Sequence, residues 1–348
     1  MNKHKVLSST FAGLILAGFI SQSAYANTSL VMNTFFPPGH FFTQTMHEWA
    51  GQVEEKTQGR VTIDIPAGGL TNASQQLSSV RSGIADISVT ANVHIHSQAP
   101  LMSFSSLPFQ IQDAEAASIA SWLTYQEFLA DSSPLESMGV HTLSVFNLSG
   151  GYLYGVQEKP IETVEELRRA RLWTLPGFTT ETLVNANVSP VTSPAVEVGE
   201  YVARSVVDAV YGITHESMTD FKASAYLKNI VEFPLAATST SFSMVINPRV
   251  WSRIDEADRK ILEELTGEHL ARMVGAAAQE AADNALKQMT EIDGIPVYAA
   301  TDELYEALKK ASEPLYENFF QQAEGAGIDG EALLESFRQE YRGAKGEL

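Results

Sequence analysis

The regular exchange of strand-like and helix-like segments along the chain is the feature that most constrains the fold. Val61, Ile63 and Ile65 alternate with polar residues, which is the period of a half-buried strand, whereas residues 43–57 carry apolar side chains at helical spacing. The same patterns predict strands at 29–35, 84–89, 139–146, 171–175, 188–192, 206–211 and 295–298, and helices at 75–82, 114–128 and from Thr163. Such alternation predicts an α/β class with largely parallel sheets.

The length of 348 residues indicates about two domains, and the pattern after Asp255 indicates how they are held together. An apolar stripe of helical period continues to about Met289 and predicts one helix of roughly 50 Å, longer than a single domain is wide. No low-complexity linker separates the two parts. We therefore expect two lobes that are joined by crossing strands and braced by this helix.

Residues 1–26 have the pattern of a secretory signal peptide. Lys3 and Lys5 give a basic start, residues 6–20 are mostly apolar, and Ala-Tyr-Ala at 24–26 is a small-x-small cleavage site. The apolar run is shorter than the roughly 20 residues of a membrane span, although an uncleaved anchor is the alternative. We expect cleavage after Ala26 and export to the periplasm. The absence of cysteine fits an oxidising compartment.

Charge and motifs exclude several classes of function. The net charge is −19, and −21 once the signal peptide is lost, so phosphate backbones and anionic lipid surfaces are repelled. The chain has no Gly-x-Ser-x-Gly elbow and no phosphate-binding P-loop. Residues 325–330 match a dinucleotide fingerprint by letters, but they follow a helix, so a plain helix–helix turn is favoured.

His94 and His96 could begin a metal site, but a zinc site normally takes at least three protein ligands. Loop histidines that line a cleft are the favoured interpretation. Acidic pairs such as Glu54 and Glu55 fall at polar positions of helices and are interpreted as solvated surface. We expect no metal and no cofactor.

Aromatic residues gather where the predicted strands end. Phe35 and Phe36 follow the first strand, and Trp173 and Tyr211 end two others. In open α/β sheets, ligands bind beyond the carboxyl ends of strands. These side chains, together with Tyr152 and Tyr154 after residues 150–151, therefore predict an aromatic-lined ligand cleft.

Six segments in order along the chain resemble motifs of one protein family, the periplasmic solute-binding proteins of TRAP transporters (DctP-like). No segment is decisive by itself, but their order behind a signal peptide is a strong signal. The likeness covers about residues 30–270 and rests on segments 49–61, 80–87, 107–109, 159–167, 190–208 and 245–251.

The resemblance implies a two-lobed, type II periplasmic-binding-protein-like fold with a hinge, whose cleft closes on one small solute. It also implies delivery of that solute to a membrane permease of two subunits, and no enzymatic activity. We expect a monomer, with lobe I at 27–150 and a return segment at about 238–278, and lobe II at 151–237 with the C-terminal 279–348. The alternatives are a secreted α/β hydrolase or lyase, and a solute-binding subunit of an ABC importer.

One departure from the family pattern bears on the ligand. The family's carboxylate-binding Arg aligns with Trp173, or with Thr174 after a one-residue slip, and its second Arg aligns near Tyr152 and Tyr154. An ammonium group is attracted to aromatic faces, so a small amine or amino alcohol such as ethanolamine, or a neutral solute, is favoured. A carboxylate held by Arg171 is the alternative. The predicted ligand-binding residues are Asn33, Phe36, Asn92, Tyr152, Tyr154, Trp173, Thr174, Tyr211 and His215.

Overall fold

The computed structural model of the chain describes residues 27–132 and 134–347. The signal peptide predicted at 1–26 and its cleavage site lie outside these residues and stay predictions. In the described part, one sheet has the strand order β2-β1-β3-β9-β4-β7-β5-β6, with β8 paired to β4 and β10 paired to β8. The strands are β1 (Thr28–Asn33), β2 (Val61–Asp64), β3 (Ile87–Ala91), β4 (His141–Gly155), β5 (Leu172–Thr174), β6 (Val191–Thr192), β7 (Ala209–Thr214), β8 (Asn229–Glu232), β9 (Thr238–Ile246) and β10 (Val297–Ala299).

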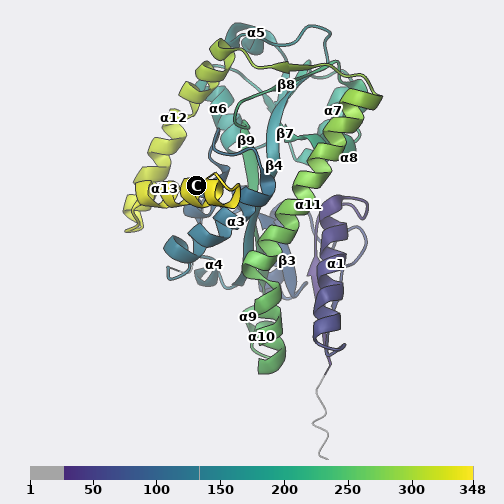
Figure 1. Cartoon of the computed structure of the whole chain (residues 1–348), viewed down its shortest axis with the longest axis vertical. Helices are drawn as coiled ribbons and strands as arrows, with labels where there is room; N and C mark the ends of the chain where they lie inside the picture. The colour runs from purple at the N-terminus through teal and green to yellow at the C-terminus, as the bar shows by residue number, and fades with distance from the viewer. Residues whose placement is uncertain (1–26, 133, 348) are drawn as a thin grey trace, which may run out of the picture.

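Helices cover this sheet on both sides (Figure 1). They are α1 (Phe41–Lys56), α2 (Gln76–Ser82), α3 (Ala114–Thr124), α4 (Pro134–Ser137), α5 (Val164–Arg169), α6 (Phe178–Asn185), α7 (Val198–Ala203), α8 (His215–Asp220), α9 (Pro248–Trp251), α10 (Glu256–Leu265), α11 (Gly267–Lys287), α12 (Asp302–Gly325) and α13 (Gly330–Ala344). The short 3₁₀ segments η2 (Asn92–His94), η3 (Pro100–Ser106) and η5 (Ala195–Glu197) also matter below. At the start of α5, Thr163 and Glu166 form the reciprocal capping box that their spacing indicates.

The sheet is mixed, which corrects the prediction of largely parallel pairing. β1 pairs in parallel with β2 and β3, and β5 pairs in parallel with β6 and β7. Strand β9, however, runs antiparallel to both β3 and β4, and β4 runs antiparallel to β7 and β8. The local patterns do not show these pairings, because β9 returns from far along the chain to lie between β3 and β4.

Strand β4 is the element that crosses between the two lobes. It is 15 residues long, about twice the predicted strand, and pairs with β9 along its first part and with β7 and β8 along its last part. The close approach of β4 to β7 requires a glycine at residue 151, because a Cβ atom there would lie 2.5 Å from the backbone of Gly212 in β7. We call the part built on β1, β2, β3 and β9 lobe I, and the part built on β5, β6 and β7 lobe II. The exact residue boundaries predicted for the lobes stay a prediction.

The long helix after Asp255 is divided into two, which corrects the prediction of one continuous helix. Helix α10 ends at Leu265, Thr266 is extended, and Gly267 has a φ of 56°, in the left-handed region that favours glycine. The second helix, α11, still has 21 residues, or about 31 Å. It contacts α1 and α3 as well as α8, and it runs diagonally from the part with α1 to the part with α7 and α8 (Figure 1). It therefore braces both lobes, as expected.

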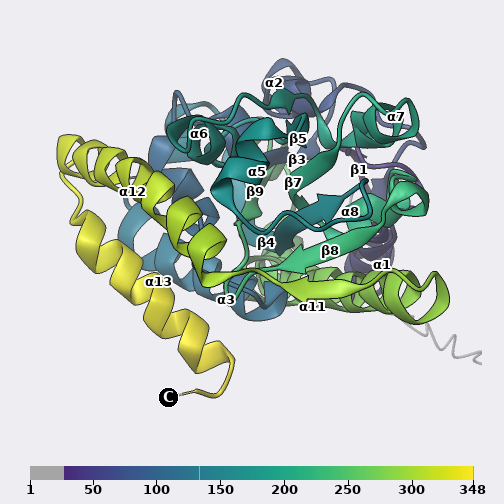
Figure 2. The same cartoon turned by 90° about the horizontal axis from the view of Figure 1, so that it is seen from above.

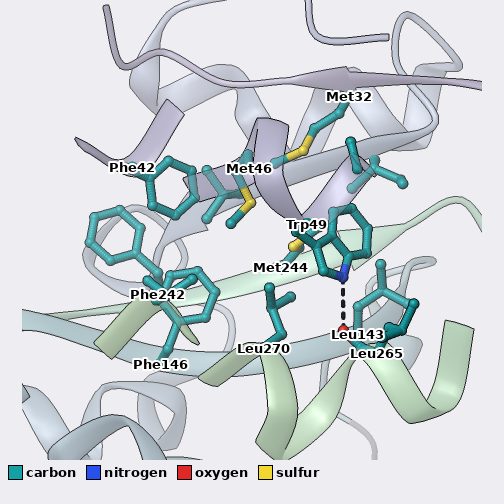
Figure 3. Packing of buried hydrophobic residues seen from close by; sticks show 14 of the residues in the cluster. Met32, Phe42, Met46, Trp49, Leu143, Phe146, Phe242, Met244, Leu265 and Leu270 are labelled. Atoms are coloured by element: carbon teal, nitrogen blue, oxygen red, sulfur yellow. Dashed lines mark hydrogen bonds between the residues drawn. The ribbon is translucent and has the colours of Figure 1, made fainter. Parts of the chain in front are cut away.

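The core of lobe I lies where α1 and α11 pack beside each other against the sheet (Figure 3). Trp49 is fully buried there, and its indole N–H donates to the carbonyl of Leu265 at 2.7 Å, just before the break between α10 and α11. The two last helices, α12 and α13, extend along one side of the molecule (Figure 2), and α13 packs on α3. None of the helices in the described part is both long and apolar enough to span a membrane.

Candidate ligand-binding site

A cavity of about 1160 Å³ lies between the two lobes. Lobe I contributes the end of β1, the loop 68–75, the segment 91–106 and the start of β9. Lobe II contributes the turn between β5 and α6, the η5 segment and the end of β7. Both lobes thus meet around one space at the strand ends, which is where the sheet topology places a ligand.

Phenylalanine rings form one wall of this cavity. Phe35 and Phe36 stack with ring centroids 4.3 Å apart, and Phe242 of β9 lies 6.5 Å from Phe35 and 5.9 Å from Phe36. Phe35 is half-buried, whereas Phe36 and Phe242 are almost fully buried among other apolar side chains. The wall therefore offers an aromatic surface that is rigid, because two of its three rings are fixed by the core.

Hydroxyl groups and two histidines form another part of the lining. Its members from lobe I are Thr71, Ser74, His94, His96, Ser97, Ser103, Ser106, Thr238, Ser239 and Thr240. The ring Nδ1 of His96 lies 3.4 Å from Ser103 Oγ. Burial lowers the pKa of both His94 and His96, with the carboxylate of Glu181 opposing the shift at His96. Both imidazoles are therefore neutral at pH 7 and can donate or accept a hydrogen bond.

The lining is poor in fixed positive charge. Across residues 27–132 and 134–347, no arginine and no lysine lines the cavity, whereas Glu181 and Glu197 stand at its exposed edge. In the same ranges, no three histidine, cysteine, aspartate or glutamate side chains lie together in a way that could hold a metal ion. His94, the last residue of η2, and His96, in the turn that follows, lie in the wall of the cleft.

The two lobes touch each other at the cavity. The ring of His96 meets Phe178 of α6 edge-on at 5.5 Å. Behind the aromatic wall, the buried His40 stacks on Phe36 at 4.3 Å and on Phe221 of lobe II at 5.9 Å. Its Nε2 lies 3.7 Å from a carboxylate oxygen of Asp220, and burial lowers its pKa to about 3. A neutral imidazole ring therefore contacts both lobes at this point.

Nine residues were predicted to bind ligand, and all nine lie in the described part of the chain. The structure places Phe36 in the lining and the other eight outside it. Trp173 is fully buried in the core of lobe II, and its indole N–H donates to Ser193 Oγ at 2.8 Å. Thr174 is also buried and donates to the carbonyl of Tyr211. The reason is topological: β5 lies between β6 and β7, so its side chains face packed layers, and the lining begins one residue later at Leu175.

Tyr152, Tyr154 and His215 gather in a cluster outside the cavity lining, whereas Tyr211 is buried in a separate core cluster. Tyr152 stacks on His215 at 4.7 Å, and the Tyr154 hydroxyl lies 3.0 Å from His215 Nδ1. His215 Nε2 in turn lies 3.6 Å from Glu232. Tyr211 is fully buried in the core of lobe II. None of these four side chains is part of the cavity lining.

The two predicted asparagines act through the segments that they hold. Asn33 is buried, donates to Thr71 Oγ1 at 2.7 Å and accepts from the N–H of Leu70 at 2.7 Å, so it fixes a loop of the lining. Asn92 donates to the carbonyl of Met102 at 2.8 Å and to Ser241 Oγ at 3.1 Å, so it ties η3 to β9. Both are positioning residues in this arrangement.

Arg171, the alternative anchor for a carboxylate, lies outside the lining. Its guanidinium is exposed and forms two hydrogen bonds to Asp208, at 3.0 Å and 2.6 Å. It also donates to the carbonyl of Ser205. The side chain thus ties β5 to the segment before β7 on the outer surface of lobe II.

One buried carboxyl group lies next to the cavity. Glu216 of α8 lies in the chain between Thr214 and Ser217, two residues that line the cavity. Only 2% of Glu216 is exposed. The hydroxyl of Ser149 in β4 lies 2.8 and 2.9 Å from its two carboxyl oxygens. Burial raises the pKa of Glu216 to about 7, against the opposing hydrogen bonds from Thr214 and Ser149.

The sequence predictions missed most of the lining because, apart from residues 194–197, it comes from segments outside the family-like motifs. Phe242 and the hydroxyls of β9 belong to residues 238–246, which no prediction assigned to a strand. The alternation of Thr238, Thr240 and Phe242 with serines could have found this strand. Its place beside β3 and β4, however, depends on long-range pairing that alternation does not encode.

Comparison with known proteins agrees with this architecture. The family model of the bacterial extracellular solute-binding proteins, family 7 (DctP), matches residues 32–323. The outer membrane transporter protein TsaT of Comamonas testosteroni is 26% identical over 327 residues, which cover 94% of this chain and 95% of that protein.

Solved structures of TRAP solute-binding proteins have the same fold. One from Bordetella bronchiseptica, with bound (R)- and (S)-mandelate, has a TM-score of 0.84 and 26% identity and covers 91% of this chain and 99% of its own. One from Rhodoferax ferrireducens, in complex with copurified benzoate, has a TM-score of 0.80 at 19% identity and covers 92% of this chain and 99% of its own. Such proteins are receptors rather than enzymes, which removes the alternative of a secreted hydrolase or lyase. The chain belongs to the DctP family of TRAP periplasmic solute-binding proteins, family 7 of the bacterial extracellular solute-binding proteins.

Proposed function

We propose that this protein captures a small aromatic solute with one polar head group and delivers it, as a monomer in the periplasm, to a TRAP membrane permease. The observation that carries the proposal is the wall of Phe35, Phe36 and Phe242 in a cavity whose lining also holds hydroxyls and histidines. An aromatic ring gains both apolar burial and ring–ring contact on such a wall. The Bordetella bronchiseptica relative, which holds mandelate, supports the same class of ligand.

An anionic head group has uncharged partners available here. Gly177, Phe178 and Thr179 line the cavity at the start of α6, and no side chain caps that helix end. The free N–H groups of a helix N-terminus and the helix dipole favour a negative group. Together with the imidazoles of His94 and His96, these donors are the groups that we expect to receive a carboxylate.

A small amine or amino alcohol is the second candidate. It is favoured by the presence of Glu181 and Glu197 in the lining and by the lack of any arginine or lysine there, in the part of the chain that the structure describes. The aromatic faces first expected to hold an ammonium, those of Trp173, Tyr152 and Tyr211, lie outside the lining and no longer support it.

Calorimetric titration with four related compounds separates these candidates. (R)-Mandelate carries a ring and a carboxylate, lactate lacks the ring, 2-amino-1-phenylethanol replaces the carboxylate by an amine, and ethanolamine lacks the ring as well. We expect mandelate to bind most tightly and lactate roughly thirtyfold more weakly, because burying a ring contributes about 2 kcal/mol. Tighter binding of ethanolamine than of mandelate would contradict the proposal and favour the amine.

A further inference from the structure

We infer that Gly177 is a positioning residue that determines whether the two lobes can close on a ligand. The inference rests on the proposed function for its biological meaning, but its steric basis is independent of which solute binds. It concerns the contact between the turn that follows β5 in lobe II and the η2 segment of lobe I. Both segments line the cavity.

The backbone of Gly177 has a conformation that side chains disfavour. Its φ is 92° and its ψ is −142°, a region that is essentially restricted to glycine. It stands between Pro176 and the first residue of α6, so it sets the direction in which this helix leaves the turn. Any side chain at residue 177 therefore strains the backbone of this turn, whether the lobes are open or closed.

The second constraint acts across the cleft. A Cβ atom built on Gly177 would lie 2.5 Å from Cγ2 of Val93, far inside ordinary contact distance. Val93 belongs to η2 in lobe I, so the two residues come from opposite lobes. Among the described residues other than its two chain neighbours, only Val93 has an atom within 4 Å of that Cβ position, so the collision is with Val93.

The neighbouring contact shows that this is where the lobes meet. His96 of lobe I touches the ring of Phe178, the residue after Gly177, edge-on at 5.5 Å. A methyl group at residue 177 would push η2 away from the turn and open this ring contact as well. The cavity would then stay open at the side where α6 begins, so bound ligand would leave faster while its entry changed little.

The test uses three variants. Gly177→Ala adds the Cβ atom, and Val93→Ala in the same chain removes the methyl group with which it collides. Gly139→Ala is the control for backbone strain, because Gly139 has a φ of 82°, lies outside the cavity lining and has nothing within 4 Å of its Cβ position. Thermal unfolding of each variant reports the strain itself.

The first readout is the distance between the lobes. The chain has no cysteine, so spin labels can be attached at Glu54→Cys in α1 and Glu200→Cys in α7, two exposed positions on opposite lobes. Pulsed electron resonance should show a longer distance between the two labels when Gly177→Ala is added to the labelled protein. The original distance should be restored when Val93→Ala is added as well. This readout is made with and without mandelate, so it does not depend on the identity of the solute.

The second readout is the rate of ligand release, with (R)-mandelate as the probe. We expect dissociation to be roughly tenfold faster in Gly177→Ala, with association nearly unchanged, and to recover in the Val93→Ala double variant. An unchanged lobe distance in Gly177→Ala, or a distance that Val93→Ala does not restore, would overturn the inference. If mandelate fails to bind the wild type while the distances behave as expected, the proposed ligand is wrong and the inference stands.

Discussion

Trp173→Ala should lower the free energy of unfolding by about 3–5 kcal/mol, the range typical of deleting a large buried aromatic side chain. Trp173 is fully buried among the apolar side chains of lobe II, and the variant also leaves Ser193 Oγ without its indole donor. Folded Trp173→Ala should keep its ligand affinity within a few-fold, because the cavity lining begins at Leu175. Urea unfolding and calorimetry on the same preparation measure both quantities.

Tyr226→Ala is the matched control, because this aromatic side chain is 44% exposed and its loss should change stability little. The opposite pattern for Trp173→Ala, a small loss of stability with a collapse of affinity, would mean that the ring contacts the ligand. That outcome would restore the prediction made from the sequence, in which Trp173 replaces a ligand-binding arginine.

Glu216→Gln should stabilise the protein at high pH and have a much smaller effect at low pH. Burial raises the pKa of Glu216 from an ordinary value of 4.5 to about 7, so the folded protein holds a proton that the unfolded chain releases. The wild type therefore loses stability as the pH rises from about 4.5 to 7, by roughly 3 kcal/mol in total. Glutamine keeps the shape of the neutral acid and lacks this titration.

Urea unfolding at pH 5 and pH 9 tests this prediction. We expect Glu216→Gln to exceed the wild type by about 3 kcal/mol at pH 9 and by less than about 1 kcal/mol at pH 5. Glu54→Gln, at an exposed position of α1, should show almost no pH-dependent difference. A gain for Glu216→Gln that is equal at both pH values would contradict an elevated pKa in the folded protein.

The sequence predicts those parts of the fold that depend on local patterns. The capping box at Thr163 and Glu166 and the helical stripe from Thr43 are local, and both are found in the structure. Phe36 could be placed in the cleft because it comes just after β1, at the carboxyl end of a strand. In each case a few adjacent residues carry the information.

The rest of the site depends on which strands become neighbours. Trp173 is buried because β6 and β7 lie on either side of β5, and nothing within residues 171–175 specifies that. Phe242 joins Phe35 in the cavity wall only because β9 returns to lie between β3 and β4, more than 200 residues after Phe35. The break at Gly267 has a local signal that the prediction overlooked, because the five-residue step from Leu265 to Leu270 is out of phase with a continuous helical stripe.

The central claim is that one small aromatic solute lies against the phenylalanine wall between the lobes. Native mass spectrometry of the protein with (R)-mandelate tests it most directly, with Phe35→Ala as the variant. Phe35 is half-buried at the cavity, and Phe320 of α12 is a half-buried phenylalanine remote from it, so Phe320→Ala is the control. We predict one mandelate per wild-type and per Phe320→Ala chain, recovered chemically unchanged, and loss of most of the bound ligand in Phe35→Ala. Equal occupancy in Phe35→Ala and the wild type would contradict the account.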